Sequence, residues 1–135
     1  MGDEHEVAIA QEHDIVVARQ TARELARVLG FGAIDQSRVA TAVSELTRNV
    51  IRYATDSRGL VTLRTLDDGG RIGLEIVVAD DGPGIVDVDL VMTEGYTSGE
   101  GLGLGLSGTK RLMDEMELVS VVGQGTTITI RKWRR

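Results

Sequence analysis

Three residues in one stretch of the chain, Glu45, Asn49 and Arg52, carry groups that could take part in phosphoryl transfer. They are spaced four and three residues apart, so on a helix they share one face. An Asn carbonyl can join phosphate oxygens around a Mg²⁺ ion, and a carboxylate one turn earlier can accept a proton from a hydroxyl or a water. A solvated helix edge with an incidental Glu/Asn pair would show the same pattern.

A second group of residues, Asp80-Asp81-Gly82-Pro83-Gly84, directly follows an apolar stretch. If that stretch is a strand, Asp80 lies at its exit, and Gly82 and Gly84 let the backbone turn tightly. A carboxylate held there can accept a hydrogen bond from an exocyclic amine such as that of adenine. An ordinary Asp-Gly-Pro-Gly turn remains an alternative. A calcium loop is disfavoured, because glycines occupy the positions where oxygen ligands are needed.

A glycine run formed by Gly101, Gly103 and Gly105 precedes a predicted helix that carries Lys110. Bare backbone amides at a helix N-terminus can hold phosphate. A dinucleotide-binding fold would need a strand before the glycines, but residues 91–100 are polar and rich in turn formers. A Walker loop is excluded because Lys110 follows the Thr instead of preceding it. A flexible hinge loop is the remaining alternative.

Hydrophobic periodicity and turn residues predict the elements that position these groups. A helix capped by Asp14 should run to Leu29, and a second should open at Asp35 with one apolar stripe. A third helix should contain Leu106, Thr109, Met113 and Met116, with Lys110 and Arg111 in its early turns, and a short helix is expected at 88–92. Strands are expected at 6–10, 60–66, 71–79, 118–122 and 126–133, the second and third as a hairpin. This order favours an α+β two-layer sandwich with the helices on one face of a mixed sheet.

Composition limits the classes of protein that the chain can represent. At 135 residues we expect a single domain spanning 1–135, with a core low in aromatics, which make up 3%. A net charge of −6 argues against nucleic-acid binding. Cysteine is absent, and neither a signal peptide nor a membrane span is evident. We therefore expect a cytoplasmic protein without a membrane or nucleic-acid partner.

Taken together and in this order, the motifs resemble the GHKL (Bergerat-fold) ATPase and kinase superfamily. Residues 44–49 resemble its N box, 80–84 its first glycine box, 101–106 its second, and 123–126 its late G-x-G-T element. The resemblance implies ATP and Mg²⁺ as cofactors and residues 85–100 as an ATP lid. It implies Glu45 as general base and Asn49 as the Mg²⁺ ligand. It further implies Asp80 as the adenine contact, supported by Thr126, with the glycines of both boxes near the nucleotide.

Within the superfamily, the chain is most similar to the RsbT-like switch kinases, over nearly its whole length. Matching stretches outside the nucleotide motifs include 14–16, 29–32, 34–36, 110–115 and 132–133. The resemblance implies a serine/threonine kinase that acts by partner switching in the stressosome and in sigma-factor regulation. It would phosphorylate STAS-domain antagonists and activate a PP2C-type phosphatase. Because the lid contains no Lys or Arg, Arg52, Lys110 or a partner's residue must neutralise the γ-phosphate.

Two other functions fit parts of the pattern. A nucleotide-dependent binding module of the anti-sigma-factor kind would use ATP only as a conformational ligand, with little phosphotransfer. The detached catalytic domain of a histidine kinase is disfavoured, because His5 and His13 lie ahead of the fold with no dimerisation helices around them. Gyrase-, MutL- and Hsp90-like proteins are disfavoured too, since we expect no further domain after Arg135.

Overall fold

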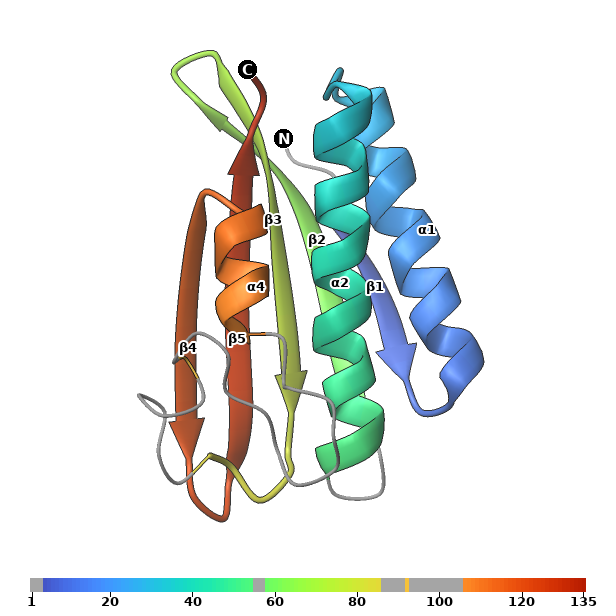
Figure 1. Ribbon diagram of the computed structural model, residues 1–135, viewed down its shortest axis with the longest axis vertical. Helices are drawn as coiled ribbons and strands as arrows, with labels where there is room; N and C mark the ends of the chain where they lie inside the picture. The colour runs from blue at the N-terminus through green and yellow to red at the C-terminus, as the bar shows by residue number, and fades with distance from the viewer. Residues whose placement is uncertain (1–3, 55–57, 86–91, 93–105) are drawn as a thin grey trace.

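The computed structural model describes residues 4–54, 58–85, 92 and 106–135 as three helices and five strands (Figure 1). In chain order the elements are β1 (Glu4–Ile9), α1 (Glu12–Val28), α2 (Ala33–Tyr53), β2 (Gly59–Asp68), β3 (Arg71–Asp80), α4 (Leu106–Leu112), β4 (Glu115–Val121) and β5 (Gly125–Trp133). Of the helices that the structure describes, none combines the length and the apolar character needed to cross a bilayer.

The five strands form one sheet in the order β1-β2-β3-β5-β4. All four ladders between these strands are antiparallel, so the expectation of a mixed sheet is wrong. Two of the ladders belong to tight hairpins, β2–β3 and β4–β5, whose short turns allow only antiparallel pairing. The β2–β3 hairpin that the sequence predicted is present, and Gly69 and Gly70 in its turn both have positive φ.

The helices pack on one face of the sheet and give a two-layer α+β sandwich, which confirms the predicted fold class (Figure 1). The apolar stripe predicted on α2 faces this core: Val39, Val43, Leu46 and Val50 are buried. Alternate residues of the central strands meet it from the sheet side, as the period of two in a strand requires. These buried strand residues are Val61, Leu63, Leu74, Ile76, Val78, Ile128 and Ile130.

The third helix is shorter than the sequence suggested. α4 ends at Leu112, Met113 follows it, and Met116 lies in β4, which begins at Glu115. Lys110 and Arg111 therefore stand in the last turn of α4 and not in early turns. The reason is a long-range contact: the Asp114 amide donates to the Arg131 carbonyl at 3.0 Å, which draws the chain into the sheet. Nearly all of the short helix expected at 88–92 lies outside the described residues.

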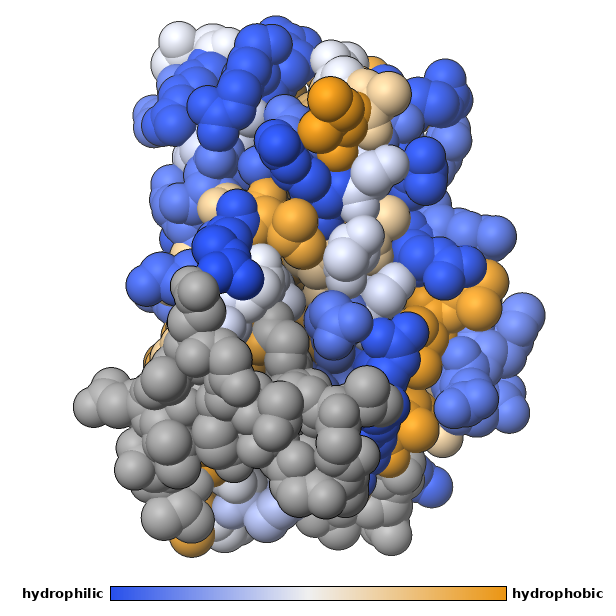
Figure 2. Space-filling view, in the orientation of Figure 1, coloured by the Kyte–Doolittle hydropathy of each residue, from blue (hydrophilic) through white to orange (hydrophobic). Residues whose placement is uncertain are grey.

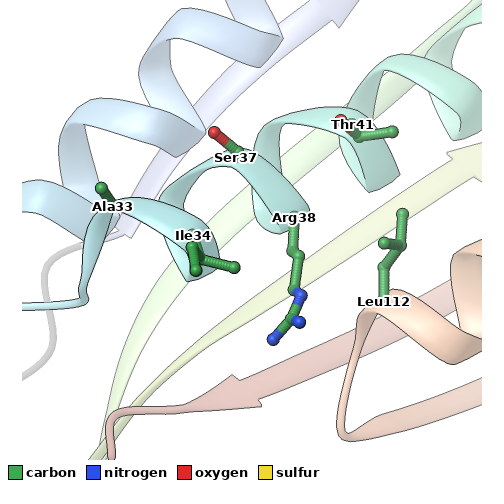
Figure 3. Close-up of a pocket in the computed structure, with 6 residues that line it drawn as sticks. All are labelled: Ala33, Ile34, Ser37, Arg38, Thr41 and Leu112. Carbon is green, nitrogen blue, oxygen red and sulfur yellow. The ribbon is translucent and has the colours of Figure 1, made fainter.

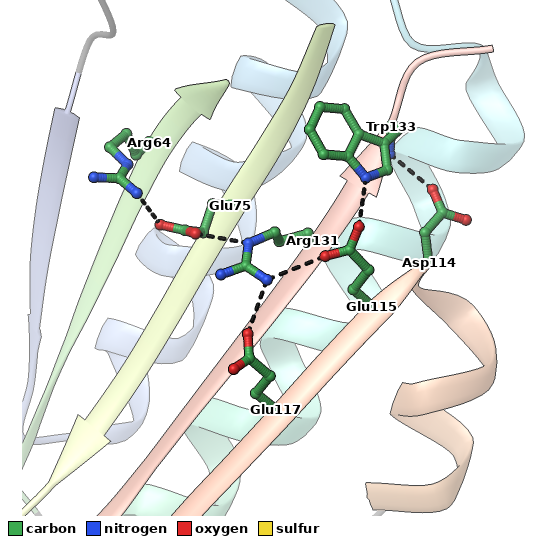
Figure 4. A network of polar contacts seen from close by, with 7 residues as sticks. All are labelled: Arg64, Glu75, Asp114, Glu115, Glu117, Arg131 and Trp133. Carbon is green, nitrogen blue, oxygen red and sulfur yellow. Dashed lines mark hydrogen bonds and ion pairs between the residues drawn. The ribbon is translucent and has the colours of Figure 1, made fainter. Parts of the chain in front are cut away.

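The opposite face of the sheet carries a row of ion pairs that crosses β2, β3, β5 and β4 (Figure 4). At its centre Glu75 accepts hydrogen bonds from Arg64 at 2.7 Å and from Arg131 at 2.8 Å. Arg131 also reaches Glu115 and Glu117 at 3.1 and 2.9 Å. These residues are cross-strand neighbours in the ladders, so the row depends on the register of the sheet.

Candidate nucleotide site

Asp80 is the last residue of β3, where the sequence placed it, and its ladder partners come from the two neighbouring strands. It pairs with Gly59 of β2 on one side and with Thr126 of β5 on the other. Its Oδ1 accepts a hydrogen bond from the Gly82 amide at 2.8 Å. The structure thus brings Thr126, which lies far from Asp80 and Gly82 in the sequence, to the same end of the sheet as these two residues.

The surroundings of Asp80 favour a carboxyl group that accepts hydrogen bonds from neutral donors. Partial burial raises the pKa of Asp80 above its ordinary value, the backbone amides of Gly82 and Thr126 oppose that rise, and the charge of Asp81 adds to it. A half-buried acceptor of this kind is suited to a neutral amine, such as the exocyclic amine of adenine.

Two glycines permit the close backbone approach that builds this end of the sheet. Gly125 has a φ of +126°, and a Cβ there would lie 2.1 Å from the Asp80 carbonyl oxygen. Gly84 has a φ of +80°, and a Cβ there would lie 2.6 Å from the Val121 carbonyl oxygen. Any other residue at either position would push the 80–84 turn away from the β4–β5 hairpin.

Ser120 is a residue of this site that the sequence reasoning missed. Its Oγ accepts a hydrogen bond from the Ile85 amide at 2.7 Å and forms another, 2.8 Å long, with the Thr126 hydroxyl. The Gly123 amide donates to the Pro83 carbonyl at 2.8 Å nearby. Ser120 therefore ties the turn after Asp80 to Thr126. The signal in the sequence that could have found Ser120 was its place in a predicted strand, 118–122, which a short turn joins to the strand that carries Thr126. In the β4–β5 ladder Ser120 lies opposite Thr126.

Glu45, Asn49 and Arg52 all lie on the C-terminal half of α2, on the side of the molecule where β3 ends (Figure 1). The connection is direct at Val50, whose Cγ1 would lie 2.8 Å from a Cβ at Gly59, the ladder partner of Asp80. The turn of α2 that carries Asn49 thus packs beside the strand end that carries Asp80.

The carboxylate of Glu45 forms an ion pair with Arg48 at 3.0 Å, one turn along α2. Both side chains are partly exposed, at 35% and 38%. Such a pair is weak, so Glu45 can leave Arg48 at little cost when a better proton donor arrives. The exposed guanidinium of Arg52 makes no hydrogen bond or ion pair with the part of the chain that the structure describes.

The remaining predicted site residues fall into two groups. Lys110 is exposed on α4, where no hydrogen bond or ion pair to another described residue holds it. Gly101, Gly103 and Gly105, together with most of the predicted lid, lie outside the described residues. Among residues 4–54, 58–85, 92 and 106–135, no group of three or more His, Asp or Glu side chains could hold a metal ion by itself.

Comparison with known proteins relates this geometry to a family. The family described as "Histidine kinase-, DNA gyrase B-, and HSP90-like ATPase" matches residues 34–135. Serine/threonine-protein kinase RsbT of Bacillus subtilis (strain 168) is 49% identical over 135 residues, which is 100% of both chains. Anti-sigma F factor of Thermoanaerobacter sp. (strain X514) is 31% identical over 99 residues, 70% of this chain and 68% of that protein.

Among solved structures, the mycobacterial sensor histidine kinase MprB superposes with a TM-score of 0.60 at 20% identity, covering 100% of this chain and 99% of that one. The catalytic domain of histidine kinase ThkA gives a TM-score of 0.56 at 14% identity, with 96% of each chain covered. At these identities the two structures support the fold alone. The chain belongs to the histidine kinase-, DNA gyrase B- and HSP90-like ATPase family and, within it, to the serine/threonine-protein kinases related to RsbT.

Proposed function

We propose that this protein is an ATP- and Mg²⁺-dependent serine/threonine kinase that acts by partner switching. The observation that carries the proposal is the constellation at the end of β3. There the half-buried Asp80 carboxylate lies beside Thr126, and the turn of α2 that bears Asn49 packs next to the same strand end. The relationship to RsbT, which extends over the full chain, supports the same conclusion.

Each residue has a distinct role in this proposal. Asp80 accepts a hydrogen bond from the exocyclic amine of adenine. Thr126 and Ser120 hold in place the turn that carries Gly82 and Gly84. Asn49 would offer its amide oxygen to Mg²⁺, and because Mg²⁺ at nucleotide sites is held by few protein ligands, a larger acidic cluster is not needed. Bound Mg²⁺ supplies charge neutralisation at the phosphates. Arg52 and Lys110, both exposed cations, are the candidates for further contacts to phosphate oxygens.

Glu45 is the proposed general base for the acceptor hydroxyl. It stands one turn before Asn49 on the same helix, which places a proton acceptor next to the metal ligand. Its ion pair with Arg48 has to open before it can accept a proton. The glycine run Gly101, Gly103 and Gly105 is proposed to border the phosphates with its backbone amides.

The proposed substrates are STAS-domain antagonists phosphorylated on Ser or Thr, and the proposed target after release is a PP2C-type phosphatase. The proposed setting is a cytoplasmic stress-signalling complex, the stressosome, that controls a sigma factor. Support comes from the names of the relatives, since one is a serine/threonine kinase and others are anti-sigma F factors.

The deciding experiment measures transfer of labelled phosphate from ATP to a purified STAS-domain protein in the presence of Mg²⁺. Glu45→Gln should slow transfer by about 10²–10⁴-fold while nucleotide affinity stays within about twofold of the parent. Asn49→Ala should weaken Mg·ATP binding itself. Arg48→Ala is the matched control, because it frees the Glu45 carboxylate and should leave transfer intact. Transfer by Glu45→Gln at the parent rate would exclude Glu45 as the base.

A second function, a nucleotide-dependent binding module with little phosphotransfer, is favoured by one observation. The carboxylate of Glu45 forms an ion pair with Arg48, and this pair, although weak, competes with a role as general base. If the parent protein transfers no phosphate to any STAS-domain protein, yet binds one only when Mg·ATP is present, the binding module replaces the kinase as the better description.

A further inference from the structure

A shallow apolar groove lies between the first half of α2 and the last residue of α4 (Figure 3). Its volume is about 370 Å³. Leu112 projects from α4 toward α2 in this view. The described residues that line the groove are Ala33, Ile34, Ser37, Arg38, Thr41 and Leu112. Ile34 is 69% exposed, so its apolar surface is available to a ligand.

The two walls of the groove are held in place by Lys132, which is only 3% exposed. Its Nζ donates to the Leu112 carbonyl at 2.7 Å, at the C-terminal end of α4. The same Nζ lies 3.7 Å from Asp35 of α2 and 3.8 Å from Asp114. Lys132 therefore joins the start of α2 to the end of α4 and keeps the space between them open and preformed.

The surroundings of the groove are basic, although the whole chain has a net charge of −6. In the ion-pair cluster beside the groove, three cations (Arg38, Lys132 and Arg135) share two carboxylates (Asp35 and Asp114). Arg38 is itself a wall residue, and its side chain is 48% exposed. The cluster therefore keeps an excess positive charge that a ligand can reach through Arg38.

A further cation approaches the groove from α1. The Arg23 guanidinium lies 3.5 Å from the Ser37 hydroxyl, and no carboxylate in the described part of the chain pairs with it. On the face of the molecule that carries the helices, apolar residues are surrounded by hydrophilic ones (Figure 2). An apolar centre with a polar rim is common to protein interfaces, and here the rim includes the cations Arg38 and Arg23.

Ile34, at one end of the groove, is far from the Mg²⁺ ligand proposed for ATP, whereas Thr41, at the other end, is one helical turn before Glu45. Ile34 and Asn49 are fifteen positions apart on the same helix, which at about 1.5 Å per residue separates them by about 22 Å. A side chain seated beside Ile34 therefore does not compete with nucleotide for space.

We propose that this groove, which goes beyond the kinase site, docks an acidic segment of a protein partner through one bulky apolar side chain. The apolar side chain fills the space between Ile34 and Leu112, and flanking carboxylates pair with Arg38 and Arg23. A small anion is a poor occupant because the lining is mostly apolar. A second copy of the chain is a poor one too, because a stable dimer buries about 20–30 residues on each side, and six line this groove.

The test uses amide NMR spectra of the full chain with a synthetic peptide as probe. The peptide has one leucine flanked by two glutamates on either side. One twin replaces the glutamates with lysine, and another replaces the leucine with serine. We expect the acidic peptide to shift amide signals at residues 33–41 and 112 and to bind at least about tenfold more tightly than either twin. The shifts should persist when Mg·ATP is added.

Two pairs of variants of this chain make the test specific. Arg38→Glu should weaken the acidic peptide about tenfold or more, whereas Arg27→Glu should not, although Arg27 also forms an exposed i,i+3 ion pair. Ile34→Glu should weaken it similarly, whereas Val28→Glu should not, although Val28 is 66% exposed. Thermal melts of all four variants establish that each is folded.

Three outcomes would overturn the proposal. The first is the absence of shifts at residues 33–41 with the acidic peptide. The second is equal binding of the lysine twin, which would mean that the basic rim selects nothing. The third is a set of shifts that grows with protein concentration without any peptide, which would make the groove a contact between copies of this chain. None of these outcomes depends on phosphotransfer, so the kinase proposal is tested separately.

Discussion

The ion-pair row on the open face of the sheet should contribute measurably to stability, and Glu75 is the residue on which it depends (Figure 4). Its side chain is only 10% exposed, and its two oxygens accept hydrogen bonds from two arginines, Arg64 and Arg131. Glu75→Gln keeps the size of the side chain and one acceptor oxygen, but it removes the charge that both guanidiniums face.

The cost can be worked from the exposure of each partner. Arg64 is 50% exposed, so its pair with Glu75 should contribute less than about 1 kcal/mol. Arg131 is 26% exposed, and a hydrogen bond between charged groups with that burial is worth about 1.5 kcal/mol. Arg131 keeps Glu115 and Glu117 as partners, which limits the loss. We expect Glu75→Gln to lower the free energy of unfolding by about 2 kcal/mol.

The assay is urea unfolding at pH 7, followed by circular dichroism, together with a thermal melt. For a domain of this size 1 kcal/mol corresponds to about 4 °C, so Tm should fall by about 8 °C with an unchanged urea m-value. Glu117→Gln is the matched control. It removes a carboxylate that contacts the same Arg131, but its side chain is 63% exposed, and the loss should stay under about 0.5 kcal/mol.

The reasoning would be refuted if Glu75→Gln and Glu117→Gln cost the same, because burial would then not decide the strength of these pairs. It would also be refuted if Glu75→Gln unfolded at the urea midpoint of the parent. A double-mutant cycle with Arg131→Gln gives the coupling energy between Glu75 and Arg131 directly.

Three further changes test the nucleotide end and α4. The pKa of Asp80 is raised in the folded protein, so at pH values above the ordinary Asp pKa its ionised form lowers the free energy of unfolding. Asp80→Asn should therefore raise the Tm of the nucleotide-free protein at pH 7. This gain should vanish as the pH falls below the ordinary Asp pKa. The same variant should weaken Mg·ATP binding in calorimetry. Gly125→Ala should abolish nucleotide binding or folding, since its Cβ would lie 2.1 Å from the Asp80 carbonyl oxygen, and a calorimetric titration alongside a melt distinguishes the two losses. Thr109→Val should stabilise the protein by about 1 kcal/mol in urea unfolding, because the buried Thr109 hydroxyl has no hydrogen-bond partner among the residues that the structure describes. Thr109→Ala, which leaves a cavity, should not stabilise it.

Much of the fold follows from local patterns in the sequence. The apolar stripe from Val39 to Val50 can be recognised from the helical period alone. The turn at Gly69-Gly70 can be recognised because glycine readily adopts the positive φ that a tight hairpin requires. The position of Asp80 at the exit of β3 follows because the apolar residues before it form a strand and the glycines after it end that strand. Glu45 and Asn49 share a helix face for the same local reason.

What depends on distant pairing could not be read from the sequence. α4 ends at Leu112 because the Asp114 amide donates a hydrogen bond to the Arg131 carbonyl in β5. This contact overrides the helical pattern, which extends to Met116. All described ladders of the sheet are antiparallel because β1 pairs with β2, and β5 with β3, in opposite chain directions. These strands are joined by long connections, so no local pattern in the sequence encodes their direction.

The chemistry of individual side chains divides in the same way. The sequence by itself determined which groups are present and which helix or strand carries each, because backbone propensity and hydrophobic period act over a few residues. Only the tertiary structure decided that Ser120 meets Thr126 beside Asp80, that Glu75 is buried on the open face, and that Lys132 is enclosed between α2 and α4. Burial and register arise when segments far apart in the chain pack together, and that packing sets which charges pair and which remain available to a ligand.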